Sequence, residues 1–236
     1  MKVEIVRNTF INGRPVFSGG VESVSDKTAK QLIDANKARI FEGDEKPSVE
    51  ELRGMYAGRS VALLGGGPSL PDDLKKIEKS NPVLIGINHH AQLYLVKCDA
   101  VVFLDTPEKT AELGQAAQAA AIAVTPHGRY ATHYLDIPHG DYGMTAGLGL
   151  WLAVHFGAKE IILCGMDCYS GTKPYFYDRE VKKQHPSGVD DQVAYWKILA
   201  AEVDTPIKAV SGPLVKVFKP YRAPAKKTGG KGKNIK

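Results

Sequence analysis

The sequence is short of the residues that would assign it to several common classes of protein. It has three cysteines in 236 residues, too few for a disulfide framework, and three residues separate Cys164 from Cys168 rather than the two typical of zinc knuckles. We therefore expect buried free thiols. No run approaches the roughly 18 apolar residues of a membrane-spanning helix, and the first residues lack the basic-then-apolar order of a signal peptide. These absences predict a cytoplasmic protein without a membrane span.

Acidic residues are missing from the C-terminal end. Nothing after Asp204 is acidic, and nine of the 31 Lys and Arg residues lie there. Residues 1–204 therefore hold 22 basic and 26 acidic side chains, a net charge of −4, although the whole chain has a net charge of +5. The basic character belongs to a tail. We expect at most nonspecific contact with nucleic acid at low salt, because lysines spaced by Gly and Ala have no base-reading geometry.

The chain divides into four parts by composition. Residues 1–42 hold short strand patterns around an Asn-Gly turn, followed by a capped helix, which predicts a small module of its own. Residues 43–57 are polar and predict a linker. Residues 58–212 form the largest part, and residues 213–236 are rich in Lys, Gly, Ala and Pro, which predicts a disordered tail.

Apolar runs alternate with helical stretches between residues 58 and 212. Because these runs are continuously apolar, we expect strands that are covered on both faces. This pattern predicts a doubly wound, mainly parallel, Rossmann-like α/β sheet with helices on both faces, beside the small N-terminal α+β module. The expected strands are residues 60–64, 83–87, 100–104, 121–124, 160–164 and 207–210, and the expected helices are residues 71–80, 91–97, 107–119, 146–156 and 190–202.

The first candidate site is a glycine-rich turn between the first core strand and the first helix. The run Gly65, Gly66, Gly67, Pro68 and Ser69 lets the backbone pass close to a ligand, and free N–H groups at a helix start attract anions. In an open α/β sheet this turn lies at the carboxyl end of a strand, where ligands bind. The run is neither the dinucleotide fingerprint nor a Walker loop, so a phosphate cradle and a plain tight turn both fit it.

Polar residues also end the next two predicted strands. Asn88 can hydrogen-bond a base or phosphate, or cap the following helix. Asp105 can face the same cleft, or cap a helix in its turn. The adjacent His89 and His90 point in different directions, so we do not expect both to bind one metal ion. Ser69 is the predicted cap of the first helix, with an acid three residues later completing a capping box.

Two further segments flank the strand predicted at residues 160–164. Before it, Thr145, Ala146 and Gly147 open an apolar helix whose small residues permit close approach of a ligand. After it, Asp167 stands at the strand end and a loop with three tyrosines follows. Exposed aromatic residues above a parallel sheet indicate a binding surface, although packing of a lid explains one or two of them.

Taken together, these motifs resemble a known superfamily. The succession of Gly-Gly-Gly-Pro-Ser-Leu, an Asn after the second strand, Thr-Ala-Gly opening an apolar helix, and Gly-Met-Asp-Cys-Tyr after a later strand is similar to the Campylobacter-type bacterial sialyltransferases. It also resembles 6-hydroxymethylpterin pyrophosphokinase-like and flagellin-glycosylation accessory proteins. The resemblance covers about residues 58–212. The N-terminal module resembles small modules of phage proteins, which implies the host cytoplasm if the protein is phage-encoded.

The resemblance implies a role for each matching residue. Gly67, Pro68 and Ser69 of the glycine-rich turn, together with Asn88, would hold the phosphate and ribose of a nucleotide. The segment 145–147 would approach a cytidine. In the same way Asp167 matches the Asp of the family's Gly-x-Asp motif, and Tyr169 and Tyr175 would support a departing phosphate.

The implied reaction is inverting glycosyl transfer from a nucleotide sugar, with a CMP-type donor and an unknown acceptor. Such a reaction needs a base for the acceptor hydroxyl, and the resemblance implies His185, whose imidazole suits that task. An ordinary exposed loop residue is the alternative reading of His185. Tyrosine hydroxyls and helix amides can stabilise a leaving phosphate without a metal, so we expect neither metal nor cofactor.

Two departures from the family leave alternatives open. Ala146 replaces a Ser, and the interval from Tyr175 to His185 is short. The acceptor-side lid is therefore expected to be reduced or absent, and the sugar of the donor is undetermined. One alternative is Mg-ATP-dependent, pyrophosphokinase-like phosphoryl transfer, with Asp105 and Asp167 holding the metal. Another is a non-catalytic phage structural or accessory protein that retains the fold.

Overall fold

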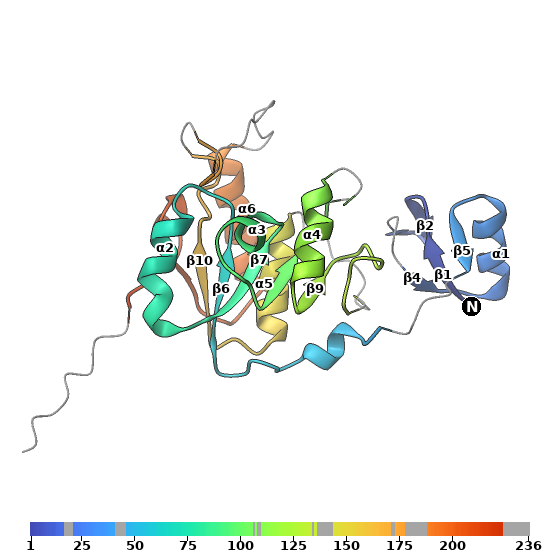
Figure 1. Ribbon diagram of the computed structural model, residues 1–236, viewed down its shortest axis with the longest axis horizontal. Coiled ribbons are helices and arrows are strands. Elements are labelled where there is room, and N and C mark those ends of the chain that lie inside the picture. The colour runs from blue at the N-terminus through green and yellow to red at the C-terminus, as the bar shows by residue number, and fades with distance from the viewer. Residues whose placement is uncertain are drawn as a thin grey trace, which may run out of the picture.

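A seven-stranded parallel sheet forms the centre of the larger part of the chain (Figure 1). The computed structural model describes residues 1–16, 21–40, 46–105, 107, 110–133, 135, 144–170, 173–177 and 188–223. The sheet has the order β12-β11-β10-β6-β7-β8-β9. Its strands are β6 (Ser60–Leu64), β7 (Val83–Ile87), β8 (Ala100–Val102), β9 (Ile122–Val124), β10 (Glu160–Cys164), β11 (Ile207–Ala209) and β12 (Lys219–Pro220). β6, β7 and β10 have the predicted bounds.

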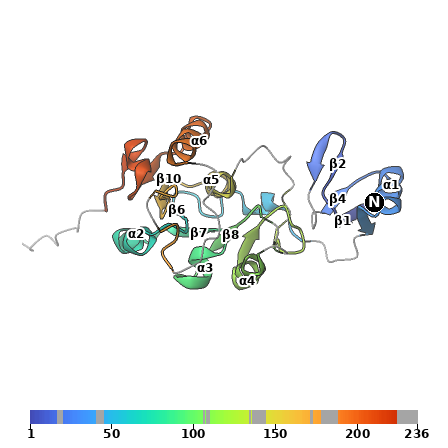
Figure 2. The ribbon, with the colours of Figure 1, turned by 90° about the horizontal axis from the view of Figure 1, so that it is seen from above.

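Helices cover both faces of this sheet, which confirms the predicted doubly wound α/β fold. One face carries α2 (Leu70–Ile77), α3 (His90–Tyr94) and α4 (Ala111–Ala119), and the other carries α5 (Thr145–His155) and α6 (Val189–Ala201) (Figure 2). A short 3-10 helix, η2 (Glu78–Ser80), follows α2. None of the described helices is long and apolar enough to cross a membrane.

Alternate residues of the central strands supply the two cores. Val61 and Leu63 of β6 belong to the cluster on the α5 and α6 face, and Ala62 and Leu64 belong to the cluster on the α2 face. All four are fully buried. A strand buried on both faces has no position for a polar side chain, which explains the continuous apolar run in the sequence.

The strand order reverses beside β6. From β6 the chain adds β7, β8 and β9 on one side, and then returns through α5 to place β10 on the other side of β6. Cys164 at the end of β10 pairs with Leu64 at the end of β6. The connections that follow these two strands leave the same edge of the sheet, and this reversal is where open α/β sheets bind ligands.

The ordered fold continues beyond residue 212, where the sequence analysis ended the domain. A short helix, η3 (Pro213–Lys216), and strand β12 follow, and the Tyr221 amide donates to the Ala209 carbonyl at 2.9 Å. The side chain of Leu214 is fully buried in the core. The expectation of a disordered tail from residue 213 is therefore wrong for the described residues up to 223. A few apolar residues anchor the segment despite its basic composition.

The described part of the predicted linker also packs on the sheet domain. Residues 49–52 form a 3-10 helix, η1, and both Val49 and Leu52 are fully buried in the main core. The ammonium group of Lys46 donates to the carbonyl of Gly128 at 2.8 Å. Burial of Lys46 lowers its pKa, and nearby Glu4 opposes this shift.

The N-terminal module has a core of its own. Its sheet has the antiparallel order β4-β1-β5, and α1 packs on it (Figure 1). Asn12 and Gly13, with φ of 52° and 77°, turn the hairpin of β2 and β3, as expected for an Asn-Gly turn. The Ser25 hydroxyl caps α1 at the Thr28 amide. The elements are β1 (Lys2–Ile5), β2 (Thr9–Ile11), β3 (Arg14–Val16), β4 (Val21–Ser23), α1 (Asp26–Asp34) and β5 (Ala38–Ile40).

Candidate functional site

A cavity of about 370 Å³ opens at the carboxyl ends of β6, β7, β8 and β10. Residues from both sides of the strand-order reversal line it. The predicted site residues on its wall are Gly65, Gly66, Gly67, Asn88, Asp105, Thr145, Ala146, Asp167, Tyr169 and Tyr175. These residues line one cavity although they are far apart in the sequence. Gly65 and Tyr175, for example, are separated by 110 positions.

Three of the predicted site residues that the structure describes are not on this wall. Pro68 is exposed beyond the turn, and Gly147 is buried inside α5. Ser69 is used in hydrogen bonds within the protein. His185, the predicted base, lies outside the described residues.

The glycine-rich turn fits tightly against the chain that follows β10. A Cβ atom on Gly65 would lie 2.4 Å from the Gly165 carbonyl oxygen, and one on Gly67 would lie 2.1 Å from Oδ2 of Asp167. The Gly67 amide donates to the Gly165 carbonyl at 2.9 Å. No side chain fits at either position, so the backbone itself forms this part of the cavity wall.

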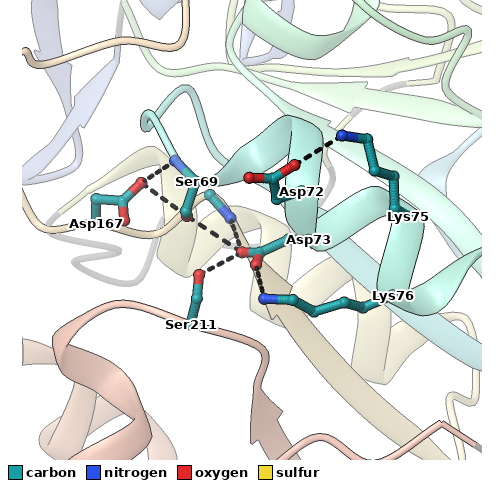
Figure 3. Close-up of polar contacts among 8 residues, drawn as sticks. Ser69, Asp72, Asp73, Lys75, Lys76, Asp167 and Ser211 are labelled. Atoms are coloured by element: carbon teal, nitrogen blue, oxygen red, sulfur yellow. Dashed lines mark hydrogen bonds and ion pairs between the residues drawn. The ribbon is translucent and has the colours of Figure 1, made fainter.

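Asp167 holds this turn in place. Its Oδ2 accepts from the Ser69 amide at 3.0 Å and lies 2.9 Å from the Ser69 hydroxyl (Figure 3). A carboxylate that is bonded twice inside the protein has less capacity left for a ligand. Asp167 therefore lines the cavity and also holds the adjoining glycine-rich turn.

A second, unpredicted carboxylate lies behind Ser69. Asp73 in α2 is 1% exposed. Its Oδ2 accepts from the Gly165 amide at 3.1 Å and from the Ser211 hydroxyl at 2.6 Å, and lies 3.2 Å from the Ser69 hydroxyl (Figure 3). Lys76 pairs with its other oxygen at 3.3 Å. Asp73 thus joins the segments that follow β6, β10 and β11.

The predicted capping box at α2 is wrong. Ser69 is the N-cap residue but makes no side-chain capping bond, because its hydroxyl lies between the carboxylates of Asp73 and Asp167. Asp72, the expected partner, instead pairs with Lys75 on the surface. Asp73 shares the buried face of α2 with Leu70 and Ile77, at a spacing of three and four residues. This helical spacing is the sequence signal that could have identified Asp73 as a buried carboxylate.

Asn88 carries a buried polar atom that the described residues leave unsatisfied. Its backbone is left-handed, with φ of 59°, a conformation that Asn tolerates better than most residues. The Asn88 amide donates to the Val102 carbonyl at 2.8 Å, which fixes the residue at the end of β7. Its side-chain Oδ1 is buried and has no hydrogen-bond partner among the described residues. A buried acceptor on a cavity wall with no protein partner is open to a hydrogen bond from a ligand or an ordered water in the cavity.

Two tyrosines, Tyr169 and Tyr175, line the same cavity as Asn88. Burial raises the pKa of Tyr169 to about 12, and the neighbouring Tyr175 and the Asp105 carboxylate add to this shift. The shift extends the pH range over which the Tyr169 hydroxyl stays protonated and can donate. Cys168 and Tyr169 are left-handed, with φ of 51° and 57°, a costly conformation for such residues that recurs at functional sites.

The segment 173–177 lies over the glycine-rich turn. The Phe176 amide donates to the Gly66 carbonyl at 3.1 Å. The ring of Tyr175 stacks on His90, with 4.6 Å between the ring centroids. Nδ1 of His90 is 2.8 Å from the Tyr177 hydroxyl.

Sequence reasoning missed several residues of the cavity. His90 lines it, although the sequence suggested only that the His89 and His90 pair does not bind one metal. Gln192 and Trp196 of α6 also line it. Their spacing of four residues puts them on one helix face, but nothing in the sequence indicates which structure that face meets.

No protein-family model matches the sequence, and no curated protein matches it. Two solved structures of the sialyltransferase CstII from Campylobacter jejuni are similar to this chain at 16% sequence identity. The complex with the substrate analogue CMP-3FNeuAc covers 70% of this chain and 87% of CstII, with a TM-score of 0.45. The complex with cytidine-5'-monophosphate covers 71% and 86%, with a TM-score of 0.46. At such low identity and TM-score, the function of CstII does not transfer to this chain by superposition.

Proposed function

We propose that the protein is a nucleotide-sugar-dependent glycosyltransferase that uses a CMP-type donor, inverts the anomeric centre and needs no metal. The observation that carries the proposal is the unsatisfied Oδ1 of Asn88 on the wall of a cavity at the strand-order reversal. A volume of about 370 Å³ is within the range of small-molecule sites. The Asn88 amide group offers both an acceptor and donors to a ribose or a base.

The donor's phosphate would lie between the glycine-rich turn and the tyrosines. The turn presents backbone rather than side chains to the cavity, as a close approach to phosphate requires. Tyr169 is protonated at neutral pH, as an ordinary tyrosine is, and its raised pKa keeps it a hydrogen-bond donor even at alkaline pH. Preorganised donors of this kind stabilise charge on a leaving phosphate.

In the proposed reaction an acceptor hydroxyl oxygen attacks the anomeric carbon of the sugar. The bond from that carbon to the phosphate oxygen breaks, and its electron pair leaves on the phosphate. The hydroxyl proton passes to a base, for which we propose His185. Tyr169 and Tyr175 would donate hydrogen bonds to the departing phosphate.

The internal use of Asp167 favours this reaction over metal-dependent phosphoryl transfer. In the kinase alternative, Asp105 and Asp167 would both hold Mg²⁺. Asp167 Oδ2 instead accepts from the Ser69 amide and lies against the Ser69 hydroxyl. Moving that carboxylate onto a metal would cost the turn both contacts.

A ligand screen by thermal shift and calorimetry tests the proposal. CMP, CDP, UDP, GDP and ATP would each be added with and without Mg²⁺, since a ligand of the native state raises its apparent stability by mass action. We expect a cytidine nucleotide to stabilise the protein without Mg²⁺. A preference for Mg-ATP would contradict the proposal, and the absence of binding by any nucleotide or nucleotide sugar at millimolar concentration would leave a non-catalytic protein.

Asn88→Ala should weaken cytidine nucleotide binding by about tenfold or more, because a hydrogen bond to a buried ligand is lost. Asn81→Ala is the matched control. Asn81 is also left-handed, with φ of 44°, but precedes β7 at the opposite edge of the sheet. Equal affinities for the two variants would remove Asn88 from the site.

A further inference from the structure

The cavity is poor in cationic side chains for a site that binds an anion. Among the described residues of its wall, Asp105 and Asp167 are acidic and none is Lys or Arg. His90 is the described wall residue that can become cationic. An imidazole ordinarily titrates near pH 6.5, so its charge responds to physiological pH.

His90 lies at the part of the wall to which the proposed function assigns the phosphate. It is 6% exposed. A Cβ atom on Gly66 would lie 2.7 Å from Cγ and Cδ2 of the His90 ring. Tyr175 stacks on the ring with an interplanar angle of 26°. The imidazole is thus held between the glycine-rich turn and a tyrosine of the site.

Tyr177 joins His90 to His89. Its hydroxyl is 2.8 Å from Nδ1 of His90 and 3.4 Å from Nε2 of His89. A hydroxyl has one proton, so both contacts are hydrogen bonds when one imidazole donates to it and the other accepts from it. If Nδ1 of His90 donates, the Tyr177 hydroxyl donates to His89. That arrangement persists when His90 is doubly protonated, because an imidazolium donates through both nitrogens.

We propose that His90 is a ligand-contacting residue whose protonated imidazole pairs with the phosphate of the nucleotide, so that binding is stronger at acidic pH. The inference rests on the proposed function and adds a pH dependence to it. Tyr177 is a positioning residue, which holds Nδ1 of His90. Since the ligand favours the protonated ring, affinity falls as pH rises through the titration of His90.

Other titratable groups surround this ring and are accounted for in the test. The groups near it, on the same cavity wall or on the segment 173–177 are His89, Tyr94, Tyr175, Tyr177, Asp105, Asp167, Cys168, Tyr169 and Lys173. The neighbouring helix α4 carries one charged residue, Glu112. Of these groups, His89 is the other one that ordinarily titrates near neutral pH, and a His89→Gln variant separates its contribution from that of His90.

Calorimetry with the methyl phosphodiester of cytidine 5′-phosphate tests the inference, since this ligand keeps one negative charge between about pH 5.5 and 8. An ion pair that raises the pKa of His90 by about one unit changes the affinity about tenfold across this range. We expect that fall in the full-length wild-type protein, a flat profile in His90→Gln, and a reduced slope in Tyr177→Phe. His133→Gln is the control, because His133 bonds to Thr132 and is not on the cavity wall.

A pH-independent affinity in the wild-type protein would overturn the inference, and so would a wild-type slope in His90→Gln. If that variant fails to fold, nuclear magnetic resonance of the wild-type protein replaces it, and a pKa of His90 that the ligand leaves unchanged overturns the inference. Sulfate, whose charge is constant in this range, separates the two proposals. Sulfate binding that depends on His90 without any nucleotide binding would reject the proposed function and the pairing of His90 with a nucleotide phosphate, and would leave His90 as an anion-contacting residue. If neither sulfate nor a nucleotide binds, both the inference and the proposed function are rejected.

Discussion

Replacing Asp73 should destabilise the fold, because this carboxylate joins three segments at the cavity edge. In Asp73→Ala the buried Gly165 amide loses its acceptor, which costs about 1–3 kcal/mol. Ser211 and Ser69 are partly exposed, so their hydroxyls can turn to water, and the loss there is about 0.5–1.5 kcal/mol together. Lys76 is half exposed and adds little. The free energy of unfolding should therefore fall by about 2–4 kcal/mol.

Urea unfolding followed by tryptophan fluorescence measures this loss by linear extrapolation. Asp72→Ala is the matched control, since Asp72 is the next residue on the same helix turn and its pair with Lys75 is exposed. Asp73→Asn should recover part of the loss, because its amide oxygen can still accept from Gly165. An Asp73→Ala variant as stable as the control would refute the reasoning, as would a change in m-value large enough to account for the shift in midpoint.

Three further predictions concern the turn and the C-terminal segment. Gly67→Ala should displace Asp167, lower the free energy of unfolding by about 1–3 kcal/mol and weaken cytidine nucleotide binding. Gly188→Ala is the control and should have none of these effects, because its Cβ would meet nothing nearer than 3.8 Å. Equal unfolding curves and equal affinities for the two variants would contradict the prediction. In a chain that ends at residue 212, the free energy of unfolding measured in urea should fall by at least about 2–4 kcal/mol, because Leu214 and strand β12 are removed. A chain that ends at residue 223 should be as stable as the full-length protein. It should no longer be retained on a DNA column at low salt, because the five lysines after residue 223 are removed. Retention of the truncated chain would show that other residues contact the nucleic acid.

The sequence alone determined six of the seven strands of the central sheet, all except β12. Residues 60–64, 83–87 and 160–164 are continuously apolar because helices cover both faces of these strands, and their bounds match β6, β7 and β10. Asn88 and Asp105 were predictable as cavity residues for a related reason. They follow parallel strands, and the carboxyl ends of such strands meet at one edge of the sheet.

Only the tertiary structure decided which polar groups contact one another at that edge. The sequence offers Asp72 and Asp73 as neighbours, and the rotation of α2 against the chain after β10 buries one and exposes the other. The place of His90 between Gly66 and Tyr175 depends on a segment 85 residues away in the chain, from position 90 to position 175. The strand β12 has no apolar pattern of its own and exists because Leu214 and the edge of β11 hold it. Periodicity reports which face of an element is buried, and the partner on that face is set by packing between distant segments.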